Sequence, residues 1–312
     1  MQSQDKDVLE HCLHWLAAGE SPWLCVIVGA VGSSPRPVGS MLACLPDGRQ
    51  AGSLSGGCVE EDLIAKLAVK SAALPELLEY GVSAEENERL GLPCGGRLTV
   101  LVQQLGQQDL SWLGSVLEAL ASRHCLLREL DLDSGAQQLM QAERFQALSL
   151  DGRLLRQWFG PRLRMLLVGA GQLAHSLAEL ALAMDYEVVI TDPRRDVLAQ
   201  WEGPNVPLVD GMPDDAVRDW AADRNSLVIT LTHDPRIDDM ALMEALESEA
   251  WYIGALGSQR TTEKRLQRLA QLGLAPDQIE RLHAPVGLDI GSKTPIEIAV
   301  AIMAQLTQLR RR

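Results

Sequence analysis

A glycine-rich turn between a strand and a helix constrains the fold of this chain more than any other feature. The segment Gly169-Ala170-Gly171-Gln172-Leu173-Ala174 follows an apolar run at 165–168 and opens a helical pattern at 172–184. In a dinucleotide fingerprint the glycines permit a tight turn and close approach of a pyrophosphate, and a small third residue lets helix and strand pack. The helix N-terminus also offers N–H groups to an anion. The pattern predicts a Rossmann-like domain, whose turn either binds a nucleotide or only serves packing.

The rest of the second half repeats this alternation of strands and helices. We expect further strands at 187–191, 227–231 and 251–253, and helices at 236–248, 258–273 and 294–311. Such alternation implies a parallel sheet with crossover helices. The predicted fold class is α/β, with an N-terminal α/β domain over 1–130, a linker region at 131–160 and a Rossmann-like C-terminal domain over 161–312.

The first half predicts an α/β domain with three glycine-rich loops. Apolar periodicity predicts helices at 5–18, 59–73 and 107–122, strands at 23–28, 77–82, 97–103 and 125–130, and a hairpin over 41–54. The glycine-rich loops fall at 32–40, 55–58 and 91–96. These loops hold the residues of this half that are candidates for chemistry.

Cys58 follows Gly56 and Gly57 at the predicted start of a helix. A helix N-terminus favours the thiolate, whereas the acidic residues at 60–62 oppose a second negative charge nearby. The glycines leave room for a ligand, and a soft thiolate suits sulfur transfer or contact with a soft metal centre. The other interpretation is a small cysteine that packs at a helix start. The spacing leaves both open.

Two more loops carry candidate ligand contacts in this half. Cys94 precedes a second pair of glycines and either closes the same pocket or lies in a tight turn into the next strand. Ser34 and Arg36 lie in the loop 32–40, where they could grip an oxyanion or phosphate. Alternatively, Arg36 is solvated on a rigid surface loop.

The second half adds Asp192 and His233, each at the end of a predicted strand. An acid at the position of Asp192 binds a ribose hydroxyl in NAD-dependent proteins, but Arg194 and Arg195 could accommodate a 2′-phosphate, so NAD and NADP both remain candidates. His233 lies at the edge where doubly wound folds bind ligands, as an acid, a base, an anion contact or a structural histidine.

Two helix starts in this half carry capping signals. Ser258 is expected to be the N-cap of the helix at 258–273. Thr294-Pro295-Ile296-Glu297 has the form of a capping box with proline at the first helical position. Both signals predict structural roles.

Composition excludes several classes of protein. The formal net charge is −14, which argues against nucleic acid or an anionic membrane surface as a partner. The chain has no apolar run of about 18 residues and no secretory pattern near Met1, so we expect neither a transmembrane helix nor a signal peptide. Its 6 cysteines form no C-x-x-C, which predicts free thiols in a reducing cytoplasm. The P-loop, H-E-x-x-H and G-x-S-x-G motifs are missing.

Taken together, the motifs resemble those of the xanthine dehydrogenase accessory proteins, the XdhC/CoxI family. In the first half the resemblance rests on Gly32–Ser40, Ser55–Glu60 and Cys94-Gly95-Gly96. In the second half it rests on the following segments: Val168–Gly171, Asp192-Pro193-Arg194, Thr232-His233-Asp234, Gly254–Ser258 and Gly287–Gly291. Ser40 stands where the family usually has alanine, and 106–160 carries no family motif.

The resemblance implies a chaperone for molybdenum cofactor rather than a catalyst. Such proteins bind the molybdopterin form, hold it during sulfuration by a cysteine desulfurase, and help insert it into apo-xanthine dehydrogenase. In that reading Cys58 contacts the cofactor and its metal, and Gly56, Gly57 and Arg36 shape the pocket and bind the pterin phosphate. The roles of Cys94 and of the Rossmann-like domain stay open, with NAD(P), part of the cofactor, or nothing in the glycine-rich turn.

The residues also permit a different class of function, an NAD(P)-dependent oxidoreductase. In this alternative His233 is the acid or base and Asp192 binds the ribose. It is the weaker hypothesis because no catalytic arrangement of lysine, histidine and tyrosine can be placed beside the fingerprint. On base rates alone, a homodimer is expected.

Overall fold

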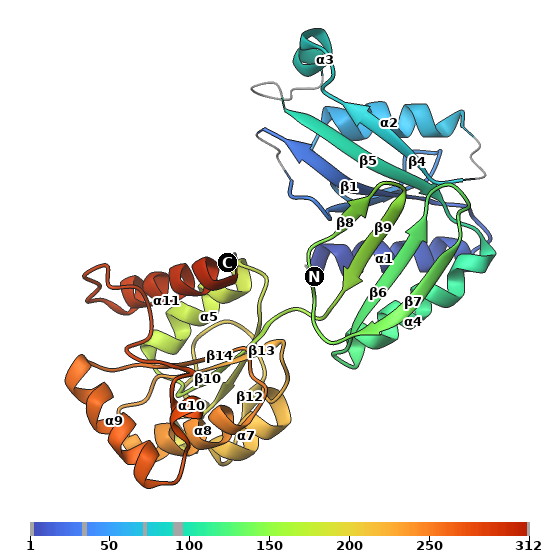
Figure 1. Cartoon of the computed structure of the whole chain (residues 1–312). Helices are drawn as coiled ribbons and strands as arrows, with labels where there is room; N and C mark the ends of the chain where they lie inside the picture. Colours follow the sequence, from blue (N-terminus) through green and yellow to red (C-terminus); the bar gives the residue numbers. More distant parts are fainter. Residues whose placement is uncertain (1–2, 33–35, 71–73, 90–95, 311–312) are drawn as a thin grey trace. The chain divides into compact units, whose positions relative to one another are not determined.

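The computed structural model describes residues 3–32, 36–70, 74–89 and 96–310 of the chain. The chain divides into two compact units, Met1–Pro161 and Arg162–Arg312 (Figure 1). Each unit has its own sheet structure and its own hydrophobic core. We call them unit 1 and unit 2.

Unit 1 contains an antiparallel sheet with the strand order β3-β2-β1-β5-β4. Side chains along a strand alternate between its two faces, so the uninterrupted apolar run of β1 is buried on both. Trp23, Cys25 and Ile27 pack with helix α2, whereas Leu24 and Val26 pack with helices α1 and α4. The elements of this part are α1 (Ser3–Ala17), β1 (Trp23–Val31), β2 (Met41–Cys44), β3 (Gln50–Gly52), α2 (Cys58–Ala68), β4 (Glu76–Tyr80), α3 (Ala84–Arg89), β5 (Arg97–Gln104), the 3-10 turn η2 (Gln107–Asp109) and α4 (Leu110–Ala121).

The predicted linker at 131–160 instead forms strands within unit 1. A second antiparallel sheet has the order β7-β6-β9-β8, with β6 (Cys125–Asp131), β7 (Gln137–Ala142), β8 (Ser149–Asp151) and β9 (Leu154–Phe159). Its inward residues Leu130, Leu155 and Phe159 join the hydrophobic cluster of α1 and α4. The unit therefore extends to Pro161.

A buried polar cluster explains why these strands look like a linker in the sequence. Arg128 is only 1% exposed, and it donates to Gln137 at 2.9 Å and to Gln103 at 2.6 Å. Its guanidinium also lies over the Trp112 ring, 4.1 Å from the ring centroid. Burial lowers the pKa of Arg128 to about 10. Glutamine, normally a sign of exposed chain, here supplies the hydrogen bonds that a buried guanidinium requires.

Unit 2 contains a parallel sheet with the strand order β12-β11-β10-β13-β14-β15. The chain enters at β10, builds outward through β11 and β12, and then returns to the other side of β10 at β13. The strand order therefore reverses between β10 and β13, which is the topological switch point of a doubly wound fold. The strands are β10 (Arg164–Val168), β11 (Glu187–Thr191), β12 (Leu208–Val209), β13 (Ser226–Thr230), β14 (Tyr252–Ala255) and β15 (Leu282–His283).

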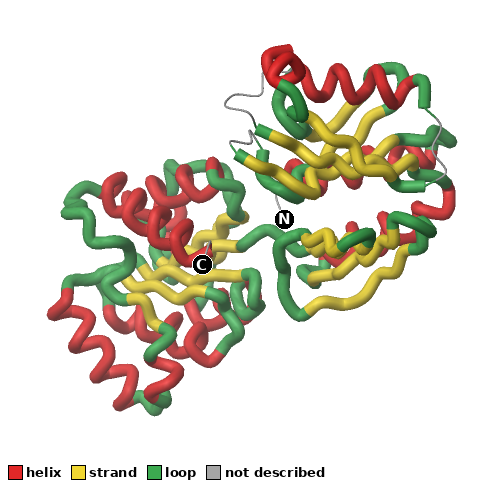
Figure 2. Tube along the Cα trace, turned by 45° about the horizontal axis from the view of Figure 1, so that its top comes forward, coloured by secondary structure: helices red, strands yellow, loops and turns green. Residues whose placement is uncertain are grey.

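Helices cover both faces of this sheet (Figure 2). Met165 and Leu167 pack on the side of α5 and α11, whereas Leu166 and Val168 pack on the side of α7, α8 and α9. The α/β fold and the Rossmann-like second half are thus as predicted. The helices are α5 (Gln172–Ala183), α6 (Arg195–Ala199), α7 (Pro213–Trp220), α8 (Pro235–Glu247), α9 (Gln259–Gln271), α10 (Pro276–Ile279) and α11 (Pro295–Arg310). Among the described helices, none has both the length and the apolar character needed to cross a membrane.

Candidate functional site

The glycine-rich loops of unit 1 join its five-stranded sheet at the same end of the strands. Val31 at the end of β1 pairs with Arg97 at the start of β5, and Leu42 near the start of β2 pairs with Gly52 at the end of β3. Antiparallel pairing therefore brings the loop before β2 and the loop that leads into α2 to the same edge. Ser34 and Cys94, which are also predicted site residues, lie outside the described residues.

The carboxylate of Glu60 organises the loop that presents Cys58. It accepts backbone N–H groups from four consecutive residues at 2.7–3.0 Å, and it also accepts both neighbouring serine hydroxyls; the donors are Ser53, Leu54, Ser55, Gly56 and Gly57. Burial alone raises the pKa of Glu60, but these hydrogen bonds outweigh it and lower the pKa to about 2. Glu60 is therefore an internal anion bound at the N-terminus of α2.

This arrangement changes what Gly56 and Gly57 can do. Their N–H groups donate to Glu60, so they offer no free donors to a phosphate in this conformation. Gly56 has φ +89°, which favours glycine, and no atom lies within 4 Å of a Cβ placed on either glycine. The pair therefore contributes the turn and open space next to Cys58.

Cys58 differs from the other described cysteines by being exposed. Cys12, Cys25, Cys44 and Cys125 are buried, and none of the five forms a disulfide. Burial raises the pKa of Cys12 to about 12, which makes that thiol a poor nucleophile and a poor metal ligand. Within the described part of the chain, Cys58 is thus the thiol that a ligand can reach.

Arg36 lies in the loop before β2 and is half-buried. Its Nη1 donates to the side-chain oxygen of Gln4 on α1, at 3.0 Å. In this conformation Arg36, the predicted oxyanion ligand, is therefore hydrogen-bonded to α1.

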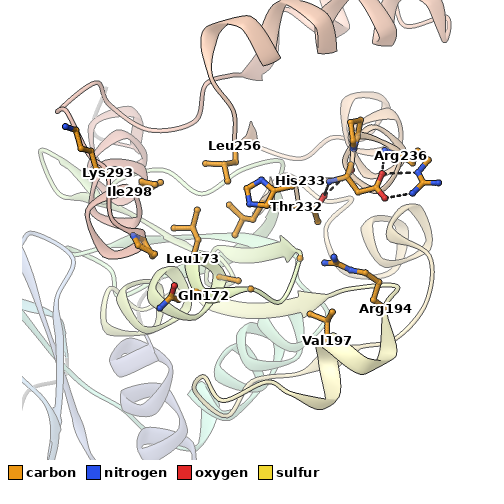
Figure 3. A pocket seen from close by; sticks show the side chains of 17 residues that line it. Gln172, Leu173, Arg194, Val197, Thr232, His233, Arg236, Leu256, Lys293 and Ile298 are labelled. Atoms are coloured by element: carbon orange, nitrogen blue, oxygen red, sulfur yellow. Dashed lines mark hydrogen bonds and ion pairs between the residues drawn. The ribbon is translucent and has the colours of Figure 1, made fainter.

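A pocket of about 920 Å³ lies in unit 2, at the carboxyl ends of the central strands (Figure 3). The start of α5, the segments after β11, β13 and β14, and the start of α11 all contribute to it. Its lining includes the predicted residues Gly169, Gly171 and His233. This is the place where doubly wound folds bind ligands, next to the switch point between β10 and β13.

The two glycines of the turn have different geometric roles. Gly169 has φ +110°, and a Cβ there would lie 2.8 Å from the Thr232 side chain, so only glycine fits. Gly171 is the N-cap of α5 and lacks a side-chain cap, while nothing lies within 4 Å of a Cβ placed on it. The first N–H groups of α5 are thus open to the pocket, as an anion site requires.

Asp192, predicted to bind a ribose hydroxyl, does not line the pocket. Its side chain is fully buried, and it accepts the Ala170 N–H at 3.0 Å. Arg194 pairs with both of its oxygens, at 2.8 and 2.7 Å. Asp192 therefore holds the glycine turn and Arg194 in place, while Arg194 itself lines the pocket.

Basic side chains outnumber acidic ones in the pocket lining. Arg194, Arg236 and Lys293 contribute positive charge, and Asp234 contributes one carboxylate, which Arg236 binds at 2.7 Å. His233 is exposed in the lining. In a chain with a net charge of −14, this local excess of cations suits an anionic ligand.

A buried ion pair behind the pocket supports two of its lining segments. Asp238 is 1% exposed and Arg265 is 3% exposed, and Arg265 donates to Asp238 at 2.9 Å. Asp238 also accepts from the Thr232 hydroxyl at 2.7 Å, and Arg265 donates to the Leu256 carbonyl at 3.0 Å. Burial raises the pKa of Asp238 to about 6, which still leaves the carboxylate ionised at neutral pH. The pair therefore joins the segment after β13 to the segment after β14.

The predicted helix caps are confirmed. The Ser258 hydroxyl accepts the Thr261 N–H at 3.2 Å at the start of α9. Glu297 accepts the Thr294 N–H at 2.9 Å, and Thr294 accepts the Glu297 N–H at 3.4 Å. In the part of the chain that the structure describes, no group of three or more His, Cys, Asp or Glu side chains is arranged to hold a metal ion.

Two family models match this chain and together cover both candidate sites. The model described as the XdhC Rossmann domain matches 165–306, and the model described as the XdhC and CoxI family matches 15–81. The chain belongs to the XdhC and CoxI family. The match at 15–81 contains Arg36 and Cys58, whereas Cys94 lies outside both ranges.

Similar proteins extend over nearly the whole chain. The molybdenum cofactor insertion chaperone PaoD of Escherichia coli K12 is 28% identical over 98% of this chain and 88% of its own length. A Bacillus subtilis 168 protein, named as a probable component of xanthine dehydrogenase, is 25% identical over 94% of each chain. A crystal structure from Bacillus halodurans, described as a xanthine dehydrogenase, is 28% identical with a TM-score of 0.76, and the match covers 99% of this chain and 96% of that one.

Sequence reasoning overlooked the residues that support the two XdhC sites. Glu60 was expected only to repel charge near Cys58, although glutamate three residues after the N-cap is the second half of a capping box. Asp238 and Arg265 lie on the buried faces of α8 and α9. Charged residues at positions where a helical pattern predicts core are a signal that could have found this pair.

Proposed function

We propose that this member of the XdhC and CoxI family is a maturation chaperone that binds molybdenum cofactor and helps insert it into an apo-xanthine dehydrogenase. The observation that carries the proposal is Cys58, an exposed thiol at the first position of α2 beside open space. The name of the Escherichia coli relative supports it, since that protein is called a molybdenum cofactor insertion chaperone.

The chemistry of this site suits a carrier. A thiolate is a soft ligand, and a single thiol bond to the metal of the cargo can form and be released. Glu60 accepts the N–H groups of Gly56 and Gly57, so the backbone that leads into Cys58 is held in place. The open space next to Gly56 and Gly57 leaves room for a ligand to approach the backbone beside the thiol.

The cofactor's phosphate requires a cation, and Arg36 is our candidate. In this proposal Arg36 exchanges Gln4 for the phosphate when the cofactor binds, and Ser34 and Cys94 contribute to the same site. A guanidinium binds phosphate through paired, charge-assisted N–H donors, so phosphate oxygens are stronger acceptors for Arg36 than the single amide oxygen of Gln4 that they would replace.

Partners complete the proposal. The chaperone holds the cofactor while a cysteine desulfurase supplies sulfur, and it then meets the apo-enzyme. We also propose that it acts as a homodimer in the cytoplasm. Light scattering of the purified chain tests the dimer, and a mass equal to one chain contradicts it.

The experiment compares wild type with Cys58→Ala, and uses Glu61→Ala on the exposed face of α2 as the matched control. Bound molybdopterin is measured as the fluorescence of its oxidised pterin, and delivery as activation of apo-xanthine dehydrogenase. We expect Cys58→Ala to lose both, with an unchanged circular dichroism spectrum, and Glu61→Ala to retain both. Full maturation by Cys58→Ala would refute the role of the thiol.

A second proposal concerns unit 2, whose pocket we assign to NAD or NADP. The uncapped N-terminus of α5 at the switch point favours this assignment, because it offers N–H donors to a pyrophosphate. Titration with NADH and NADPH, followed by nicotinamide fluorescence, tests it, and no binding of either at millimolar concentration would overturn it. If the bound nicotinamide also exchanges hydride directly with a substrate while His233 gives or takes the accompanying proton, the chain is an oxidoreductase, and an absence of turnover leaves a binding role.

A further inference from the structure

Asp192 occupies the position at which an acid normally recognises the ribose of NAD, at the end of the second strand of a Rossmann fold. Such recognition requires free acceptor sites, because both ribose hydroxyls donate to the carboxylate. The environment of this one side chain therefore decides between a dinucleotide with a free ribose diol and one with a phosphate on that ribose.

The acceptor capacity of Asp192 is already used. A carboxylate offers about four acceptor sites on its two oxygens. Oδ1 accepts the Arg194 N–H at 3.0 Å and Arg194 Nε at 2.8 Å, and Oδ2 accepts the Ala170 N–H at 3.0 Å and Arg194 Nη2 at 2.7 Å. With its side chain 0% exposed, Asp192 has no contact left for a ribose hydroxyl.

Arg194 presents the opposite charge to the pocket. Its side chain is 48% exposed and extends from the loop after β11 into the lining, as Figure 3 shows. Only two of the five N–H donors of its guanidinium engage Asp192, and these hold the planar group in one orientation. The remaining donors suit a phosphate dianion far better than a neutral diol.

The surroundings favour the same ligand. The carboxylate of Asp234 in the lining is hydrogen-bonded by Arg236 through both of its oxygens, so it leaves the outward donors of Arg194 to a ligand. Lys293 adds a further cation across the pocket. Glycines and the open start of α5 supply a separate place for the pyrophosphate, which leaves Arg194 for a second, terminal phosphate.

We infer that the pocket of unit 2 selects a dinucleotide with a 2′-phosphate, of the NADP type, and that Arg194 reads this phosphate. The inference rests on the proposed nucleotide pocket and specifies its ligand. Asp192 is a positioning residue in it, because it fixes Arg194 and does not touch the ribose.

The full-length protein is titrated with NADPH and NADH, two probes that differ only in the 2′-phosphate. We expect wild type to bind NADPH at least about tenfold more tightly, as one charge-assisted contact supplies. Arg194→Gln should lose this preference by weakening NADPH while NADH binding is kept. Arg195→Gln is the matched control, because Arg195 is 83% exposed, pairs with Asp210 and does not line the pocket, and its preference should stay as in wild type.

The possible outcomes distinguish selection of the 2′-phosphate from nucleotide binding by the pocket in general. Equal binding of NADPH and NADH by wild type would overturn the selection and leave the nucleotide pocket standing. No binding of either probe would remove the nucleotide pocket itself. A preference that Arg194→Gln and Arg194→Lys both retain would overturn the assignment to Arg194, and this comparison within each variant does not depend on its stability.

Discussion

The two glycine-rich turns of this protein look alike in sequence and differ in what they offer a ligand. Each precedes a long helix, α2 in unit 1 and α5 in unit 2. In unit 1 the N–H groups of the turn before the helix, Gly56 and Gly57 included, donate to Glu60, and the exposed group is the thiol of Cys58. In unit 2 the donors of α5 stay open, and cations surround them. A glycine-rich turn can bind an external anion only through N–H groups that no internal carboxylate has already taken. Glu60 takes those of both glycines in unit 1, whereas Asp192 takes only that of Ala170 in unit 2.

The residues that hold the two turns in place also differ in how far they lie from the turn along the sequence. Glu60 lies in the helix that directly follows the turn, so the turn of unit 1 is stabilised by contacts that are local in the sequence. In unit 2 the turn contacts Asp192 on the next strand, and the neighbouring segments depend on Asp238 and Arg265, which belong to different helices. Substitutions that break these tertiary contacts should therefore destabilise the pocket of unit 2, and this can be tested.

The largest effect is expected from Arg265→Met, which removes the cation and leaves Asp238 buried without its partner. Loss of one member of a buried pair costs about 3–5 kcal/mol. Arg268→Met is the matched control on the same helix, because Arg268 binds Asp239 and is 34% exposed. Urea unfolding of both variants checks this, and equal midpoints would contradict a special role for the buried pair.

Glu60→Gln should be next in size and confined to unit 1. The amide nitrogen cannot accept the N–H groups that now point to the carboxylate, and the loss should be about 2–3 kcal/mol. Glu61→Gln, on an exposed neighbour, should change stability by less than about 0.5 kcal/mol. Hydrogen exchange of α2 and of the Ser53–Gly57 loop measures the difference, and unchanged protection in Glu60→Gln would rule out the capping role.

The same group predicts a pH dependence for unit 1. Because the folded pKa of Glu60 is depressed to about 2 from 4.5, its stabilisation is present above about pH 4.5 and is lost as the pH falls toward 2. Roughly 2 kcal/mol of it should be gone by pH 3. Denaturant midpoints of wild type and Glu60→Gln should therefore converge on acidification, and a constant gap between them would argue against this linkage.

The smallest stability effects distinguish the two glycines of the unit 2 turn. Gly169→Ala should cost about 1–3 kcal/mol, because φ is positive and the new methyl would meet Thr232 at 2.8 Å. Gly171→Ala should leave the melting temperature nearly unchanged, yet it places a methyl in the pocket and should weaken nucleotide binding. Thermal melts beside NADPH titration give both numbers, and the reverse pattern would mean that the turn serves packing alone.

Strand and helix placement followed from periodicity where the pattern was apolar. The expected strand at 187–191 coincides with β11, and the expected helix at 172–184 with α5 to within one residue. The prediction failed at 131–160, where the glutamines bound to Arg128 made a strand region appear polar. The helix predicted over 59–73 ends at Ala68. Short elements such as α6 and β12 offer too few residues for a period to show.

The sequence by itself determined the fold class, the glycine turns, the helix caps and the family resemblance, because these depend on near neighbours and on spacing along the chain. Only the tertiary structure decided which polar groups remain free for a ligand. Asp192 appears in the sequence as a ribose acceptor, yet hydrogen bonds from Ala170 and Arg194 use its oxygens. Hydrogen-bonding capacity is consumed by whichever groups the fold brings within about 3 Å, and a linear pattern does not record those neighbours.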